Sequence, residues 1–195
     1  MPREGDLRME LTTRPLTAGL WPAFETLFGE KGAKSGCWCM YWRIGSLYRR
    51  QAGAQNRDAF RAVVEAGPPP GLLAFVAADP VGWCQIGPRR SIPHIDRVWR
   101  LRSPDRKPVW SISCLYVAKD VRRQGVASHP VKEAIDFGRS GGATIIEAYP
   151  IDRRMSPSSS STGFMTTFER LGFRPVPSPT PERPILRLEL GHATG

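Results

Sequence analysis

The chain has 195 residues, of which 41% are hydrophobic, and a formal net charge of +10 at pH 7. This length and composition predict a single domain over residues 7–191, with flexible ends at 1–6 and 192–195. No apolar stretch approaches the roughly 20 residues that a membrane span needs, and residues 1–6 form no apolar signal region, so we expect a cytoplasmic protein without a membrane partner.

The first half of the chain predicts strands and helices that alternate before a hairpin. Strands are expected at 7–11, 72–77 and 81–86, and helices at 17–28 and 56–65. Thr17 is expected to cap the first helix. The glycine and proline run at 67–71 ends the second helix, because proline cannot continue its hydrogen-bond ladder.

A basic segment follows at 87–108. It holds seven arginines and lysines against two aspartates, which is half of the net charge of the chain. Such a segment is either a solvated arginine-rich loop or a surface that attracts a polyanion, an acidic substrate or the phosphates of a nucleotide cofactor.

The second half predicts a strand, a glycine-containing turn and a helix, and then further strands. Strands are expected at 110–117, 144–149 and 185–190, helices at 127–138 and 162–171, and a mobile serine-rich segment at 153–161. This order indicates an α/β (α+β) protein with one twisted, mixed, mostly antiparallel sheet flanked by helices.

The turn between the strand at 110–117 and the next helix is suited to an anion. Residues 122–127 lie at a helix N-terminus, where unpaired N–H groups and the positive end of the helix dipole converge. Gly125 and Ala127 let a ligand approach the main chain closely. The sequence therefore predicts a diphosphate site here.

These residues also carry a family resemblance. The pattern Arg122-x-x-Gly125-x-Ala127 resembles the acyl-CoA pyrophosphate motif of the GNAT N-acetyltransferases, and Phe168-Glu169-Arg170-Leu171-Gly172-Phe173 resembles their later helix-to-strand signature. The segments 36–43, 81–84 and 147–152 are similar to a bacterial subgroup of that family. The resemblance covers residues 7–190 and implies the GNAT acyl-CoA N-acyltransferase fold.

The resemblance also implies how acetyl-CoA, as co-substrate, is held. The backbone of the central strand is expected to pair with the pantetheine arm, and an N–H group near Val117 to polarise the thioester. Backbone N–H groups of the turn are expected to hold the pyrophosphate, with two arginines adding positive charge. The cofactor-binding residues implied are Leu115, Tyr116, Val117, Arg122, Arg123, Gln124, Gly125, Val126, Ala127 and Ser128.

Two positions depart from the family pattern and leave the proton transfers unassigned. Phe168 stands where many members have a tyrosine that protonates the thiolate, and Ser111 where some have a glutamate. Glu147, the charged residue of an otherwise apolar strand, is the candidate base, although a buried acid is either paired structurally or tuned for use. Tyr149 is the candidate acid, with simple packing as its alternative.

Other residues suggest weaker interpretations. Trp38 and Trp83 are candidate substrate-binding aromatics, which core packing explains equally well. Cys114 is conceivable as a nucleophile, but no activating histidine is evident. The spacing of the four cysteines and the scatter of the three histidines suit no metal site, so we expect buried thiols and no metal.

The sequence thus predicts an N-acetyltransferase that transfers acetyl from acetyl-CoA to a primary amine of a small molecule or peptide, by direct attack in a ternary complex. The protein would be a monomer or homodimer. One alternative is a catalytically silent acyl-CoA-binding regulator, motivated by Phe168 and Ser111. Another is a basic nucleic-acid-associated protein, although the chain has no recognised nucleic-acid motif.

Overall fold

The computed structural model describes residues 10–122, 124–151, 161–181 and 183–191. The ends predicted to be flexible, Arg123, and all of the predicted mobile segment except Ser161 lie outside these ranges. No helix in the described ranges is both long and apolar enough to cross a membrane.

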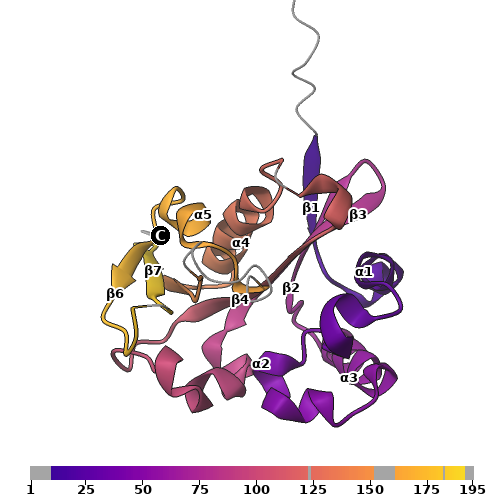
Figure 1. The fold of residues 1–195 in the computed structure, drawn as a ribbon. Helices are drawn as coiled ribbons and strands as arrows, with labels where there is room; N and C mark the ends of the chain where they lie inside the picture. The colour runs from indigo at the N-terminus through magenta and orange to yellow at the C-terminus, as the bar shows by residue number, and fades with distance from the viewer. Residues whose placement is uncertain (1–9, 123, 152–160, 182, 192–195) are drawn as a thin grey trace, which may run out of the picture.

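Seven strands form one continuous twisted sheet in the order β1-β2-β3-β4-β5-β7-β6 (Figure 1). Their bounds are β1 Leu11–Pro15, β2 Gly71–Val76, β3 Asp79–Pro88, β4 Trp110–Val117, β5 Ile145–Ala148, β6 Arg174–Val176 and β7 Ile185–Glu189. The pairing of β4 with β5 is parallel and every other pairing is antiparallel. The predicted mixed, mostly antiparallel sheet flanked by helices is therefore confirmed.

In the described part of the chain, five α-helices and several short turns connect the strands. The helices are α1 Trp21–Phe28, α2 Tyr41–Ile44, α3 Gly53–Ala66, α4 Ser128–Ser140 and α5 Met165–Glu169. Single turns of 3₁₀ helix lie at Ala18–Leu20, Gly45–Arg49, Arg89–Ser91, Pro93–Arg97, Trp99–Leu101 and Lys119–Val121, and a π turn lies at Gly32–Gly36. The basic segment at 87–108 is thus an ordered chain of short turns.

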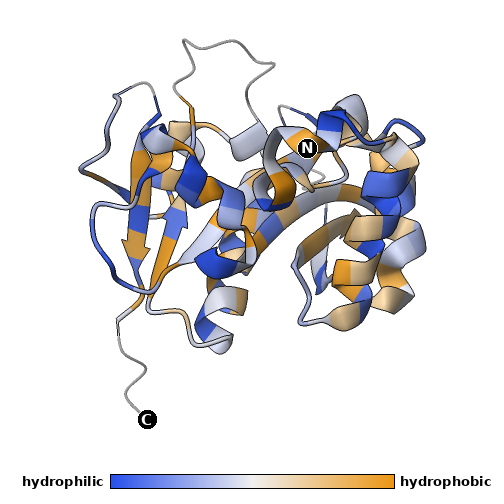
Figure 2. Cartoon of the chain, turned by 90° about the horizontal axis from the view of Figure 1, so that it is seen from below, coloured by the Kyte–Doolittle hydropathy of each residue, from blue (hydrophilic) through white to orange (hydrophobic). Residues whose placement is uncertain are grey.

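The inner strands of the sheet are buried on both faces. Successive side chains of a strand point to opposite sides, and helices cover each side. Leu73 and Trp83 pack on one face in the cluster that includes α1 and α3. Their neighbours Leu72 and Cys84 pack on the other face against α4, in the cluster that also contains Phe168 of α5. Figure 2 shows the strands as a curved sheet with largely hydrophilic loops at its periphery.

Two helix predictions were wrong. Thr17 makes no side-chain capping bond, and α1 begins only at Trp21, with a proline in its first turn. The helix expected at 162–171 is reduced to α5, because Gly163 has a left-handed φ of +80° and Phe164 is extended. A Cβ on Gly163 would lie 2.7 Å from Leu115 Cδ1, so the close approach of the two segments fixes this conformation.

The pairing of the two central strands is short. Only Trp110–Ile112 of β4 pairs with β5, through Ile146–Ala148. Beyond Ile112, β4 continues for five residues, of which Cys114–Val117 pair with β3 on its other side and Ser113 lies at a register shift. The two parallel strands therefore separate in the middle of the sheet, and one edge of β4 is left without a strand partner among the described residues.

Candidate functional site

The free edge of β4 and the turn that follows it form one continuous surface. Unpaired backbone groups at a strand edge are a template for an extended ligand, which pairs with them as another strand would. The chain continues from Val117 through the 3₁₀ turn Lys119–Val121 to the N-terminus of α4, a helix of 13 residues. The predicted donor-binding residues that the structure describes, Leu115–Val117, Arg122 and 124–128, therefore follow one another along this edge and turn.

The turn itself has room for a bound group beside its backbone. Gly125 has a φ of +78°, and a Cβ built there would meet no atom within 4 Å. Ser128 N–H donates to the Gly125 carbonyl at 3.1 Å, which shapes the turn into the first residues of α4. Arg122 Nε donates to the Val117 carbonyl at 2.9 Å and links the turn to the end of β4. Arg123 lies outside the described residues. These features suit an anionic group.

A cavity of about 490 Å³ opens beside the same segment of β4. Its wall includes Cys114, Leu115 and Tyr116 of β4, and the rest comes from segments distant in sequence: the end of α1 through the turn at 45–49, the turn at 98–101, Ser161 and Arg183. A substrate in this cavity would therefore lie next to the β4 edge on which the pantetheine arm is expected.

The described lining of this cavity is rich in thiols, phenols and guanidinium groups and contains no aspartate, glutamate or histidine. Cys37, Cys39 and Cys114 lie on its wall as free thiols, with Cys39 Sγ 3.8 Å from Cys114 Sγ. Burial raises the pKa of the Cys37 thiol to about 11 and that of the Cys39 thiol well above its usual value. The thiols of Cys37 and Cys39 are thus protonated near neutral pH and are weak nucleophiles.

Glu147 is fully buried in a network of ion pairs. Its Oε1 accepts hydrogen bonds from Arg89 and from the Tyr149 hydroxyl, the latter at 2.7 Å, and its Oε2 accepts from Arg187 Nε at 2.8 Å. Both oxygens are therefore paired, and the residue is absent from the cavity wall. Of the two alternatives left open by the sequence, this geometry favours structural pairing.

The network ties the basic segment to the sheet. Arg89 also donates to the carbonyl of Leu101 at 2.9 Å and to Asp96 at 2.7 Å. Arg187 pairs with Asp105 through both of its terminal nitrogens, at 2.7 and 3.0 Å. Because Leu101 lines the cavity, the network holds one wall of it in place. No local pattern marks Arg89 or Arg187 in the sequence, since each is one of many arginines and Glu147, their shared partner, lies far along the chain.

The other residues considered for proton transfer are also enclosed. The Tyr149 hydroxyl is 2.8 Å from both Arg89 Nη1 and Ser111 Oγ, and burial, with Glu147 beside it, raises the pKa of Tyr149 well above its usual value. Ser111 is 1% exposed and Phe168 is fully buried in the core beside Phe173. Among these side chains, none is on the cavity wall.

The two tryptophans proposed as substrate contacts are placed in the core. Trp38 is 4% exposed and packs on Phe28, and Trp83 is fully buried with its Nε1 donating to Cys39 Sγ at 3.1 Å. Neither lines the cavity, whose aromatic wall includes Tyr41, Trp42 and Tyr48 instead. The geometry favours core packing for Trp38 and Trp83.

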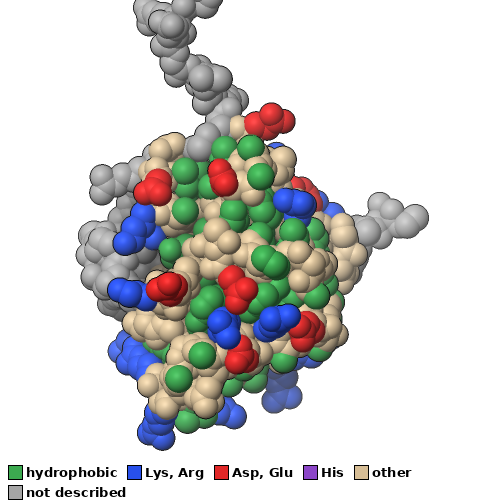
Figure 3. Space-filling view, turned by 90° about the vertical axis from the view of Figure 1, so that its right-hand side faces the viewer, with side chains coloured by type: hydrophobic (Ala, Val, Ile, Leu, Met, Phe, Trp, Pro, Cys, Tyr) green, Lys and Arg blue, Asp and Glu red, His purple; other side chains and the backbone are tan. Residues whose placement is uncertain are grey.

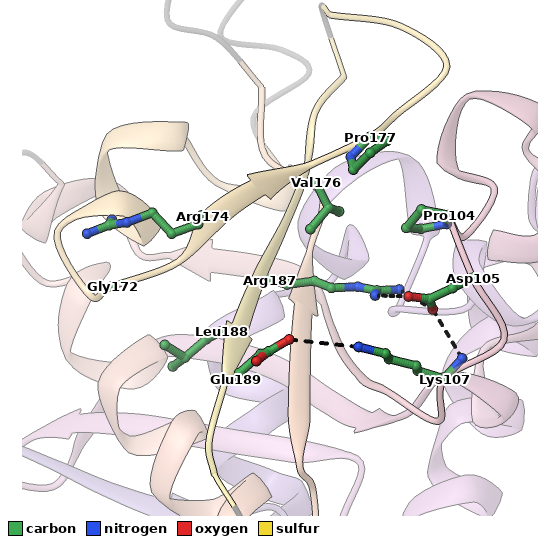
Figure 4. Close-up of a pocket in the computed structure, with 10 residues that line it drawn as sticks. All are labelled: Pro104, Asp105, Lys107, Gly172, Arg174, Val176, Pro177, Arg187, Leu188 and Glu189. Carbon is green, nitrogen blue, oxygen red and sulfur yellow. Dashed lines mark hydrogen bonds and ion pairs between the residues drawn. The ribbon is translucent and has the colours of Figure 1, made fainter.

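A larger hollow, of about 640 Å³, lies at the β6–β7 end of the sheet (Figure 4). Arg187 points across it to Asp105, and Lys107 Nζ lies 4.0 Å from Glu189 Oε1. Its charged groups are largely paired with one another, and its lining does not include the edge of β4. We therefore place the candidate site at the smaller cavity.

On the face turned toward the viewer in Figure 3, acidic and basic side chains are intermixed without a large field of one sign. No group of three or more histidine, cysteine, aspartate or glutamate residues in the described ranges is arranged to hold a metal ion.

Comparison with known proteins identifies a family. A model of the acetyltransferase (GNAT) family matches residues 37–165, which is more than half of the chain and includes β4, the turn after it and α4. A search of curated proteins found no matching sequence.

Solved structures share the fold at low sequence identity. The PaiA N-acetyltransferase of Thermoplasma acidophilum in complex with coenzyme A is 12% identical over 93% of this chain and 99% of its own, with a TM-score of 0.53. The polyamine N-acetyltransferase of Drosophila melanogaster, which forms N-acetylagmatine, is 13% identical over 93% and 100%, with a TM-score of 0.55. The NatC complex bound to Gag peptide and CoA contains a chain that is 14% identical over 93% and 99%, with a TM-score of 0.55.

Proposed function

Because the chain belongs to the GNAT acetyltransferase family, we propose that it is an acyl-CoA-dependent N-acyltransferase. It would transfer acetyl from acetyl-CoA to a primary amine of a small molecule or peptide, by direct attack in a ternary complex. Structural neighbours that bind coenzyme A, and that act on polyamines in one case, support this class of reaction.

One observation carries the proposal. β4 leaves β5 after Ile112, and the edge that it exposes has a cavity beside Cys114–Tyr116 and is followed in the chain by the glycine turn of α4. An extended thiol ester and an amine can therefore meet at Leu115–Val117 from two directions. Holding both reactants in this way supplies much of the rate enhancement in a two-substrate transfer.

We assign the binding of the acyl donor to the predicted residues. Leu115, Tyr116 and Val117 offer the strand edge, and the backbone from Gln124 to Ser128 surrounds the diphosphate, with Arg122 adding charge. Arg123 is assigned by sequence alone. The donor supplies a thioester, whose carbonyl a backbone N–H near Val117 would polarise.

For Glu147 and Tyr149, which the sequence made candidates for base and acid, we assign a different role. Glu147 and Tyr149 would act as positioning residues, because their polar atoms bond to one another and to Arg89, Arg187 and Ser111. With no carboxylate or imidazole in the described cavity wall, the amine would enter neutral and release its proton to water.

A second candidate function remains, an acyl-CoA-binding protein without turnover. Phe168 and Ser111 favour it, because both are buried where family members carry groups that transfer protons. It predicts the same donor binding and no acylated amine.

The test is calorimetric titration of the protein with acetyl-CoA, repeated on Gly125→Glu. The substitution places bulk and negative charge in the open space beside the turn, so binding should be lost. Gly142→Glu is a matched control, since Gly142 also has a positive φ (+86°) and open space but lies past the C-terminal end of α4.

Three results are distinguishable. Binding lost in Gly125→Glu and kept in Gly142→Glu supports the donor site and justifies a screen of amines by release of free thiol. Binding without turnover on any amine supports the silent alternative. If the wild-type protein does not bind acetyl-CoA, both proposals fail.

A further inference from the structure

We propose that the cavity beside β4 selects amines that also carry an anionic group, a carboxylate or a phosphate. We call it the acceptor cavity. The inference rests on the proposed function and narrows its substrate class. A diamine or polyamine would be a poor substrate.

The charges on the wall of the acceptor cavity carry the argument. Arg49, Arg100 and Arg183 line it, while its described wall holds no acidic side chain. The hydroxyl groups of Tyr41, Tyr48 and Tyr116 belong to residues of the same wall and add neutral donors. Guanidinium and phenol groups around a hollow are suited to a carboxylate or a phosphate, which accepts several hydrogen bonds at once.

The arginines of the acceptor cavity differ from those of the buried network. Arg89 and Arg187 each contact two acidic side chains. Within the described residues, no carboxylate lies within 4.0 Å of Arg49, Arg100 or Arg183. A ligand anion would therefore supply a partner that the described protein does not.

Of the three arginines, Arg183 is the one that is partly buried. Burial lowers the pKa of its guanidinium; Arg100 nearby lowers it further, while Tyr41 opposes this change. Arg100 is exposed and Arg183 half-buried, and two cations that face one cavity repel each other. An anion between them would relieve both the repulsion and the loss of solvent, whereas a second ammonium group would add to the repulsion.

One of these arginines comes from the basic segment at 87–108. Arg100 comes from the turn Trp99–Leu101, which the Glu147 network anchors through the bond from Arg89 to the Leu101 carbonyl. The network thus fixes the part of the segment that supplies a cation to the acceptor cavity. Arg49 comes from the turn Gly45–Arg49, where its Nε donates to the Tyr48 hydroxyl at 3.0 Å.

Matched amines test the proposal. Lysine is compared with cadaverine and arginine with agmatine, since each pair differs by one carboxylate. O-phosphoethanolamine is compared with ethanolamine, which isolates a phosphate. Because a hydrogen bond to a charged group changes affinity by about 10-fold or more, kcat/KM should favour the acidic member of at least one pair by about 10-fold. The carboxylate and phosphate pairs separate the two sources of charge.

Variants connect any preference to the acceptor cavity. Arg100→Gln and Arg183→Gln should each raise KM for the preferred acid by about 10-fold, while the affinity for acetyl-CoA stays the same. Arg97→Gln is the control, because Arg97 is exposed in the same basic segment and does not line the cavity. It should leave both constants unchanged.

Each outcome decides the question. Equal or better turnover of cadaverine, agmatine and ethanolamine overturns the inference and leaves the acyltransferase proposal standing. If acetyl-CoA binds but no amine is acylated, calorimetry measures the affinity of the CoA-loaded protein for each member of the same pairs, and these affinities test the inference. Tighter binding of an acidic member that weakens in Arg100→Gln supports the inference, and no such difference overturns it. Failure to bind acetyl-CoA defeats the proposed function instead.

Discussion

Replacing Glu147 by glutamine tests whether this residue holds the fold or performs the chemistry. The substitution keeps the shape of the side chain and removes its charge. In the wild-type protein the fully buried carboxylate accepts hydrogen bonds from Arg89, Tyr149 and Arg187. A glutamine offers one acceptor oxygen, and its amide N–H groups would face guanidinium donors.

The expected loss of stability is large. Removing one partner of a buried ion pair costs about 3–5 kcal/mol, because the remaining charge is buried without compensation. Asp96 and Asp105 still contact the two arginines and keep the loss within this range. Since small domains have unfolding free energies of about 5–15 kcal/mol, Glu147→Gln should weaken the protein severely.

Urea denaturation followed by tryptophan fluorescence measures the effect. Glu65→Gln is the matched control, because Glu65 forms an exposed ion pair with Arg61 at 2.9 Å on α3, and such pairs contribute about 0.5 kcal/mol or less. A variant that is unfolded without urea counts as a loss within or above the expected range. A change below about 1 kcal/mol, with kcat strongly reduced, would refute the structural role and restore Glu147 as the base.

Two further predictions concern pH. The hydrogen bond from Arg187 lowers the pKa of Asp105 to about 2. The contribution of Asp105 to stability is therefore present above its unfolded-state pKa near 4 and is lost as pH falls toward 2. Acid unfolding curves of Asp105→Asn should lack this pH-dependent loss of stability, and curves identical to those of the wild type would contradict the prediction. Because the described cavity wall has no carboxylate or imidazole, kcat/KM at saturating acetyl-CoA should rise about 10-fold per pH unit up to the pKa of the acceptor amine. A plateau beginning near pH 6–7 for an amine of higher pKa would indicate an enzyme base instead.

Much of the fold was predictable because its signals are local. The β-branched and aromatic run at Trp110–Val117 predicted β4 with its correct bounds, and the change of spacing after Gly125 predicted α4 nearly as it is. β6, with three residues, is too short to show a period, and α5 was overestimated because Gly163 is held by contacts with residues distant in sequence.

The candidate site likewise has one part that local sequence predicts and one part that it does not. The donor-binding turn is a contiguous segment whose glycine and helix start are visible in the sequence. The acceptor cavity is lined by segments that lie between residue 28 and residue 183. In the sequence, nothing distinguishes its three arginines from the other arginines. Glu147 is unusual in the sequence alone, but its two arginine partners lie 58 and 40 residues away, and nothing local indicates them.

The sequence by itself determined the family pattern, the class of sheet and the position of the turn suited to a diphosphate, because each depends on short contiguous segments and on their order along the chain. Only the tertiary structure decided which arginines are paired and buried and which face the acceptor cavity. The physical reason is that the cost of a buried charge depends on what is packed around it, and the strand order of the sheet brings those neighbours together from opposite ends of the chain.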